Sequence, residues 1–202
     1  MLRNIIASIA VLGATASIAA LGTFATFTSS TSADQASLAT GTVSIALGAP
    51  GPANRLTLGA SSLLPGDTMQ RTVDLANTGV AGSDDLGSVT LTTSAAVSSL
   101  LDTDATNGLE LAIDKCSQAW TESGSSPAFT YTCGGTTSTV LAQRAVIGSD
   151  LALSNLASLA AGQTDHLRVT LTLPTAAPNT MQGLSSQLTY TFTGTQRTAT
   201  SK

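Results

Sequence analysis

The stretch Leu167-Arg168-Val169-Thr170-Leu171-Thr172-Leu173 decides the fold, because it alternates strictly between apolar and polar residues. Successive side chains of a strand point to opposite faces, so the leucines and Val169 share one face, and Arg168 and the threonines share the other. The pattern predicts a strand that is buried on one side and faces water on the other. Strands of this kind are typical of antiparallel sheets.

The same two-residue period recurs along the chain. Four further stretches show it: Thr42 to Leu47, Val89 to Thr92, Leu109 to Ile113 and Leu188 to Thr193. Turns rich in Gly, Pro, Asn and Asp separate the stretches, so we expect an all-β fold, a jelly-roll-like antiparallel β-sandwich. Short apolar runs between them predict a few short helices, at residues 95–101, 153–159 and 179–184.

An internal repeat supports two matching corners in this fold. Ser62 to Thr68 and Ser158 to Thr164 share the pattern S-L-x-x-G-x-T at an offset of 96 residues. A glycine at such a turn gives the backbone access to positive φ, and the threonine begins an alternating strand. Coincidence is the alternative, because turns of this composition are common.

The composition excludes several classes of protein. Among the 202 residues are 33 Thr and 25 Ser, which favour strands over helix bundles. The net charge is −4, and the eight Lys and Arg residues are scattered. Without a basic cluster the chain has no electrostatic footprint for nucleic acid, so no nucleic-acid partner is expected.

The amino terminus resembles an export signal. Arg3 precedes an uncharged, mostly apolar stretch at residues 5–21, and Thr23-Phe24-Ala25 provides small residues before a cut between Ala25 and Thr26. A membrane anchor is the alternative, although the stretch is at the short end of the roughly 20 residues that span a bilayer. We expect membrane contact only through the uncleaved signal segment. The predicted organisation is a signal peptide at 1–25, an extended segment at 26–39, a sandwich domain at 40–194 and a flexible tail at 195–202.

Cysteine usage agrees with export. Cys116 and Cys133 are the two cysteines of the chain, and an even number suits an oxidising compartment. A disulfide between them would close a short loop, which the chain-entropy model values at about 3 kcal/mol. Two free thiols or half of a metal site are the alternatives.

Several motifs resemble the TasA and camelysin (CalY) family of secreted bacterial proteins. They are the junction G-T-F-A-T-F-T at residues 22–28 with A-T-G-T-V-S-I at 39–45, L-P-G-D-T at 64–68 with L-A-N-T-G at 75–79, and N-T-M-Q-G at 179–183 before a closing strand. The resemblance implies a jelly-roll sandwich, processing by a signal peptidase of the SipW type, and secretion to the extracellular matrix or the cell surface. The insertion between Cys116 and Cys133 departs from the family pattern.

The resemblance also implies self-assembly into a homopolymer, the fibres of a biofilm matrix, together with other matrix proteins as possible partners. In that assembly the freed segment from Thr26 to Ala39 would add as a donor strand to the next subunit, with Phe27 and Leu38 as its apolar anchors. Main-chain bonds would supply affinity and side-chain pockets would supply register. A disordered mature terminus is the alternative.

Camelysins are classed as metallopeptidases, but this chain is poor in metal ligands. A catalytic zinc takes about three protein ligands, usually including histidine, and His166 is the single histidine of the chain. His166 precedes the alternating strand and points opposite to Leu167, so we expect its imidazole to face solvent. No H-E-x-x-H motif occurs, and Asp84-Asp85 lies in a Gly- and Ser-rich turn. Asp102, Asp104 and Asn107 suggest calcium, although an Asx turn explains them better. The sequence therefore predicts no catalysis, metal or cofactor.

Two alternatives to a fibre protein remain open at this point. In one, the chain is a monomeric secreted binding or accessory module that uses Trp120 and Phe129, on the loop between the cysteines, as its contact surface. In the other, the chain is a peptidase of the camelysin type, which the scarcity of ligands makes least favoured.

Overall fold

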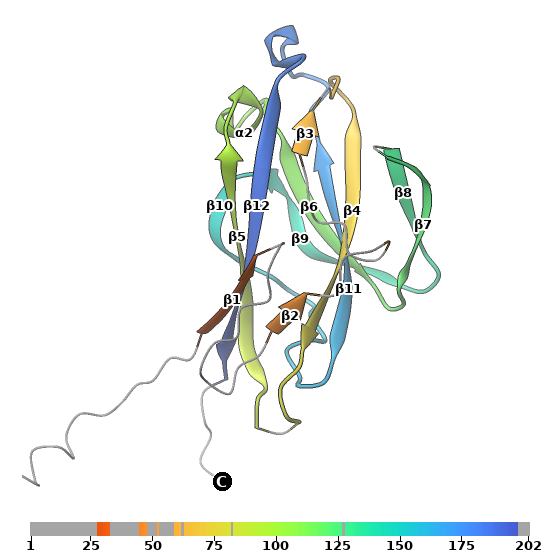
Figure 1. The fold of residues 1–202 in the computed structure, drawn as a ribbon, viewed down its shortest axis with the longest axis vertical. Helices are drawn as coiled ribbons and strands as arrows, with labels where there is room; N and C mark the ends of the chain where they lie inside the picture. The colour runs from red at the N-terminus through yellow and green to blue at the C-terminus, as the bar shows by residue number, and fades with distance from the viewer. Residues whose placement is uncertain are drawn as a thin grey trace, which may run out of the picture.

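Two antiparallel sheets pack face to face in a computed structural model of the chain (Figure 1). The structure describes residues 28–32, 45–47, 52, 59–61, 63–81, 83–126 and 128–197. No helix within these ranges has the length and apolar character needed to cross a membrane. The fold class expected from the alternating stretches, an all-β sandwich with few helical residues, is confirmed.

Each of the two sheets has five strands among the described residues. Sheet A contains β1 (Thr28–Ser32), β12 (Ser185–Gln196), β5 (Leu86–Val97) and β10 (Gly148–Ala152) in this order, with β3 (Gly59–Ser61) also on β12. Sheet B contains β2 (Ile45–Leu47), β4 (Thr68–Asn77), β11 (Thr164–Thr172), β6 (Glu110–Cys116) and β9 (Thr137–Ala145) in this order. A separate hairpin consists of β7 (Trp120–Ser125) and β8 (Ala128–Cys133). The helical turns are α2 (Leu100–Thr103) and the 3-10 turn η1 (Asn179–Met181).

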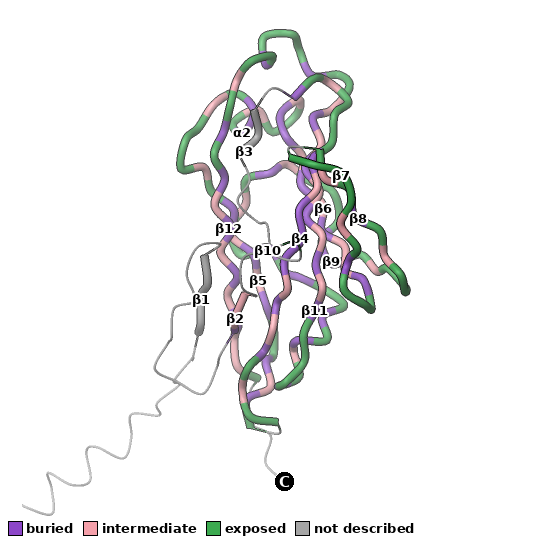
Figure 2. The backbone as a smooth tube through the Cα atoms, turned by 45° about the vertical axis from the view of Figure 1, so that its right-hand side comes forward, coloured by how far each residue is buried: buried purple, intermediate pink, exposed green. Residues whose placement is uncertain are grey.

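Strand β11 lies at the centre of sheet B and confirms the predicted alternation. Leu167, Val169, Leu171 and Leu173 have no exposed surface, whereas the polar residues between them are partly exposed. Their apolar face joins one continuous core between the sheets, to which Tyr190 and Phe192 of β12 contribute the largest fully buried side chains. Figure 2 shows the buried residues following the facing strands and the exposed residues gathering on the turns and the hairpin.

The repeated turn occurs at both corners where sheet B strands begin. Gly66 and Gly162 have φ angles of 95° and 78°, so a side chain at either position would be strained. The Gly66 amide donates to the Leu173 carbonyl over 2.8 Å, and the Gly162 amide donates to the Asn77 carbonyl over 2.8 Å. The turn before β4 therefore holds the residue that follows β11, and the turn before β11 holds the last residue of β4. The two corners are thus related by a local twofold axis between the antiparallel strands.

Two of the expected helices are absent from the described residues. Ala95 to Val97 belong to β5, because β5 continues to pair with β12 as far as Val97. The helical turn begins only at Leu100, after Ser99 caps it: the Ser99 hydroxyl accepts the Leu101 amide, and the Asp102 carboxylate accepts the Ser99 amide. Residues 153–159 form turns without a helix, and η1 covers only part of 179–184.

Candidate functional site

The hairpin β7–β8 covers part of the outer face of sheet B and is fastened by a disulfide. Cys116, at the end of β6, is bonded to Cys133, at the end of β8, and their Cα atoms are 5.7 Å apart. The disulfide expected from the sequence is thus present. Cys116 forms a small apolar cluster with Trp120 and Tyr131, separate from the main core.

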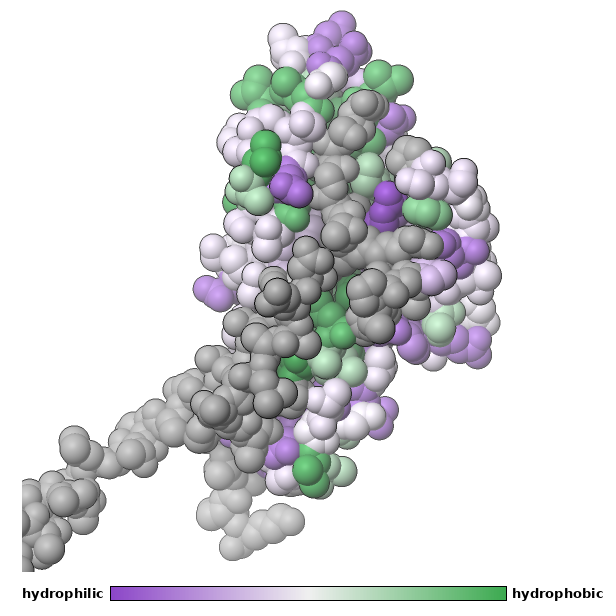
Figure 3. Space-filling model, viewed as in Figure 1, coloured by the Kyte–Doolittle hydropathy of each residue, from purple (hydrophilic) through white to green (hydrophobic). Residues whose placement is uncertain are grey.

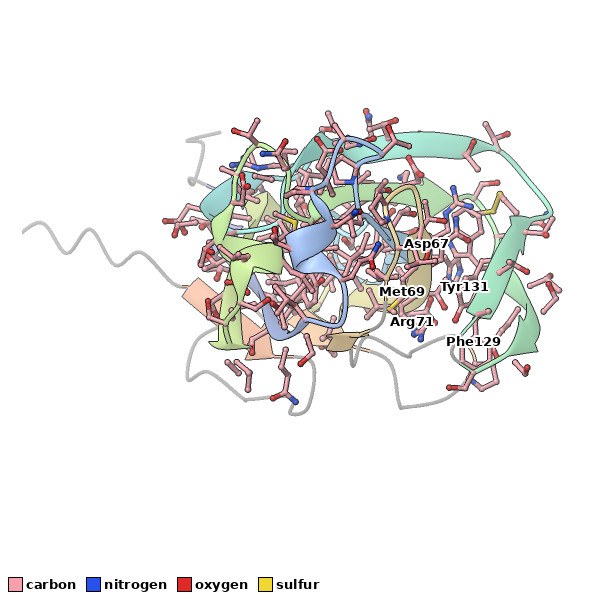
Figure 4. The ribbon with its side chains drawn as sticks, turned by 90° about the horizontal axis from the view of Figure 1, so that it is seen from above. Asp67, Met69, Arg71, Phe129 and Tyr131 are labelled. Carbon is pink, nitrogen blue, oxygen red and sulfur yellow. A yellow bond between two sulfur atoms is a disulfide. The ribbon has the colours of Figure 1, made fainter. Side chains whose placement is uncertain are left out.

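The two aromatic residues predicted as a contact surface each lie against an arginine. Trp120 is only 8% exposed, its indole N–H donates to the His166 carbonyl over 2.9 Å, and the Arg168 guanidinium lies 4.4 Å from its ring centre. Phe129 is partly exposed, and the Arg71 guanidinium lies 5.1 Å from its ring centre. Figure 4 shows Arg71 on the side of β4 that is next to Phe129 and Tyr131. The more accessible side chain of this pair therefore belongs to Phe129.

Two charged pairs lie on the outer face of sheet B, on the side that the β7–β8 hairpin covers. Arg168 contacts the Asp114 carboxylate over 3.1 Å, and His166 Nδ1 lies 2.6 Å from the Asp74 carboxylate. Tyr131 donates its hydroxyl to Glu122 over 2.8 Å. Burial, helped by this bond to the Glu122 carboxylate, raises the pKa of Tyr131 to about 12.

A third charged pair joins β6 to the beginning of β11. Lys115 Nζ lies 2.9 Å from the carboxylate of Asp165, a residue that is only 3% exposed. The same carboxylate accepts the amides of Ala157 and Ser158 over 3.0 and 2.8 Å. Burial alone would raise the pKa of Asp165, but these hydrogen bonds and the Lys115 ammonium outweigh it and lower the pKa.

Sequence reasoning missed this network of paired charges. It predicted His166 as a solvent-facing imidazole, and the structure places the side chain on the outer face of sheet B but only 26% exposed and paired with Asp74. The available signal was the charged residues on the polar face of β11. Their partners are far apart in the sequence, and only the sheet register identifies them.

The side chains of the described residues do not fit a catalytic zinc. No group of three His, Cys, Asp or Glu side chains converges within the described ranges. Both Asp84 and Asp85 bind turn backbone: Asp84 Oδ2 accepts the Val80 amide over 2.7 Å, and Asp85 Oδ1 accepts the Ala161 amide over 3.1 Å. Asp84 Oδ1 is buried without a partner among the described residues, but one carboxylate oxygen is not a ligand set.

The suggested calcium run is an Asx turn. Asp104 accepts the Thr106 and Asn107 amides, each over 3.0 Å. Asp102 instead points to serines, accepting the hydroxyls of Ser98 and Ser186 over 2.7 and 2.5 Å. The two carboxylates therefore serve different parts of the fold.

The amino-terminal strand occupies an edge of sheet A. Strand β1 pairs antiparallel with β12, with Thr28 opposite Thr195 and Ser32 opposite Thr191. The predicted cleavage position at Ala25 and Thr26 and the anchors Phe27 and Leu38 lie outside the described residues.

These features define a disulfide-braced β-sandwich whose amino-terminal strand closes a sheet edge. The chain belongs to the camelysin metallo-endopeptidase family, whose model matches residues 2–201. This confirms the resemblance noted in the motifs. Searches of curated proteins and of solved structures gave no match. The family description names a metallo-endopeptidase and so leans against our expectation of a protein without catalytic activity. The described side chains form no zinc site.

We predict that the disulfide holds the hairpin and not the sandwich. Replacing Cys116 and Cys133 together with serine should release the hairpin, because its apolar cluster is small and separate from the main core. Trp120 is the single tryptophan, so its emission should shift to longer wavelength while the far-ultraviolet β signal persists. An unchanged emission, or loss of the β signal together with the shift, would contradict this division. A Ser117→Ala variant of the wild-type disulfide form serves as the control.

Proposed function

We propose that this protein is an exported structural protein of the cell surface or biofilm matrix that polymerises into fibres by donor-strand exchange. The observation that carries the proposal is the position of β1: a five-residue strand that forms one outer edge of sheet A through its antiparallel pairing with β12. Family membership supports secretion to the extracellular space.

The pairing of β1 is suited to exchange between copies. Strand β12 provides an edge that β1 covers at Thr191–Thr195 and β3 covers at Ser185–Gln187. A second copy presents the same edge, so β1 could pair there in the same register and leave its own edge to a third copy. Strand β1 makes the same contacts with β12 whether it pairs within its own copy or with another copy. The chain segment that follows β1 and the protein concentration therefore determine which of these two pairings prevails. After each exchange one end of the assembly still carries a β1 strand to donate and the other end an uncovered β12 edge, so growth can continue.

The opposite edge of sheet A is poorly suited to continuous pairing. Strand β10 covers β5 over only a few residues, and its register is irregular between Gly148 and Leu151. Asp150 within this irregularity has a positive φ of 50°. Short, irregular edge strands discourage edge-to-edge association. The β12 edge is therefore the better site for polymerisation.

The peptidase activity in the family description is the second candidate function. One observation favours it, the match to the family model, and the described donor set does not support it. Measuring zinc bound per chain after dialysis, together with peptide cleavage before and after chelation, separates the two functions. Stoichiometric zinc and activity lost on chelation would support the peptidase.

The direct test of the proposal is microscopy of the processed protein. We expect negative-stain images of protein secreted by a host with a SipW-type peptidase to show fibres, and amino-terminal sequencing of the same sample to begin near Thr26. Monodisperse particles with the same amino terminus at high protein concentration would contradict polymerisation. They would favour the monomeric binding module, in which Phe129 on the hairpin is the accessible aromatic residue.

A further inference from the structure

We propose that β2 is donated to the neighbouring copy together with β1, and that Ile45 of β2 is the side chain that fixes the register of the exchanged segment. This exchange of two strands rests on the proposed function, because β1 is one of them. The acceptor is a second copy of this chain and has two parts. The edge of β12 receives the main chain of β1, and a socket over Gly194 receives Ile45.

Strands β1 and β2 close the same side of the sandwich. In the described part of the chain, β1 is an outer strand of sheet A and β2 is an outer strand of sheet B. The two strands follow each other in chain order and contact each other, and Figure 1 shows them next to each other below the centre of the molecule. Strand β2 pairs with β4 over only three residues, Ile45–Leu47. Release of β2 together with β1 therefore breaks only one further short ladder.

Strand β1 carries no apolar residue that could mark its register. All five of its residues, Thr28–Ser32, are serine or threonine. Strands that are polar on both faces specify their register weakly, and a slip of two residues would keep every side chain of β1 on its original face. In strand addition, main-chain bonds supply affinity and side-chain pockets supply specificity. The register of β1 on β12 must therefore come from a side chain outside β1.

Ile45 fills a pocket directly behind the β1–β12 ladder. Gly194 of β12 is the register partner of Ser29 and shares the buried face of β12 with Phe192. A Cβ atom at Gly194 would overlap Cδ1 of Ile45 and would lie 3.3 Å from Cδ1 of Leu86. Ile45, which is 4% exposed, thus takes the space that a side chain at position 194 would need. The absence of a side chain at Gly194 makes the socket, and Ile45 is the knob that fits it.

Donation of both strands keeps this contact and the contact between β1 and β2 within the donor. If β1 left alone, it would lie beside the β2 of another copy, and its own Ile45 could not align it. If β2 goes with β1, one continuous donor brings both the main chain and the apolar anchor to the acceptor. The large aliphatic side chain of Ile45 then enters the socket of the neighbour and sets the register of β1 there.

Cysteines divided between two chains test whether β2 is exchanged. Ala46 and Ala76 are register partners in the β2–β4 ladder and are both partly exposed, so cysteines at these positions lie within the reach of a disulfide. Processed Ala46→Cys and Ala76→Cys proteins are mixed, allowed to assemble and then oxidised. We expect mass spectrometry to find a disulfide between positions 46 and 76 of different chains, because β2 of one copy pairs with β4 of the next.

Two further mixtures distinguish failure of this exchange from failure of the proposed function. Ser30→Cys mixed with Thr193→Cys reports the donation of β1 alone. Thr92→Cys mixed with Thr191→Cys should give no cross-link, because β5 and β12 stay in one chain. Cross-linking of the β1 mixture without the 46–76 disulfide would overturn the donation of β2 and leave the exchange of β1 intact. No cross-link in the β1 mixture would contradict the proposed function and the donation of β2 with it.

A size-complementary pair of variants tests the role of Ile45. Gly194→Ala puts a methyl group where Ile45 lies, and Ile45→Ala removes that side chain. We expect Gly194→Ala alone to form no fibres and an equimolar mixture of the two variants to form fibres that contain both. In the mixture, the shortened residue 45 of one chain lies over the added methyl group of the other, and the intact Ile45 lies over an intact Gly194.

The double variant Gly194→Ala/Ile45→Ala is the control, because it has no overlap in either arrangement and should assemble alone. If Ile45 stayed in its own copy, the overlap in Gly194→Ala would persist in every mixture. Fibres from Gly194→Ala alone, or mixed fibres that lack this variant, would therefore overturn the role of Ile45. The cysteine mixtures leave Ile45 and Gly194 unchanged, so they decide whether β2 is donated even if Gly194→Ala does not fold.

Discussion

Locking β1 onto its own sheet is expected to abolish fibre assembly. Ser30 and Thr193 are register partners in the β1–β12 ladder, so cysteines at both positions lie within the reach of a disulfide. An oxidised Ser30→Cys/Thr193→Cys protein cannot release β1 to a neighbour. We expect negative-stain microscopy to show only monomers at concentrations where the wild-type protein forms fibres, which is an all-or-none effect.

The control variant cross-links two strands that stay paired in both the monomer and the proposed fibre. Thr92 and Thr191 are partners in the β5–β12 ladder, so Thr92→Cys/Thr191→Cys introduces the same cross-link without holding β1. This control should form fibres. Fibres from the oxidised β1 lock would rule out donor-strand exchange through this strand. Inter-subunit disulfides in the lock variant, when it is oxidised only after assembly, would show β1 paired with a neighbour.

The strands and corners of this fold follow from local patterns. The alternation around Val169 identifies a central strand because both of its neighbours bury the same face, and Gly66 and Gly162 identify turns because their positive φ excludes most other residues. The helix expected at 95–101 does not form there, because residues 95–97 extend strand β5. A short apolar run suits a strand or a helix equally, and pairing with β12 decides it.

The candidate sites depend on contacts that no local pattern contains. The pairing of Asp74 with His166 spans 92 residues, and that of Asp114 with Arg168 spans 54. Figure 3 shows mainly pale, weakly polar residues on the described part of the face in view, with smaller groups of apolar residues near its upper end and its centre. The cysteines are the exception, since their number and spacing predicted the disulfide.

Removing the buried carboxylate of Asp165 is expected to cause a large loss of stability. Its side chain is 2% exposed, pairs with Lys115, and accepts two backbone amides. Asp165→Ala leaves the ammonium and both amides without that partner, and breaking a buried pair costs about 3–5 kcal/mol. Asp114→Ala, which breaks the more exposed pair with Arg168, should cost about 1 kcal/mol or less. Urea unfolding at neutral pH measures both; equal losses would contradict the difference in burial.

The pH dependence of the same carboxylate gives a second, independent readout. Because the folded protein holds the pKa of Asp165 below its ordinary value of 3.8, protons bind to the unfolded chain first as the pH falls. The stability that this group contributes is therefore complete above the unfolded pKa and is lost as the pH falls through the folded pKa. Asp165→Asn keeps the shape of the side chain but does not titrate. The difference in unfolding free energy between wild type and Asp165→Asn should thus be largest near neutral pH and shrink as the pH falls below the ordinary carboxylate pKa of 3.8. Asp102, whose pKa is also lowered, titrates in both proteins and cancels in this comparison. A difference that stays constant with pH would mean that the carboxylate stabilises the fold through packing and not through its charge.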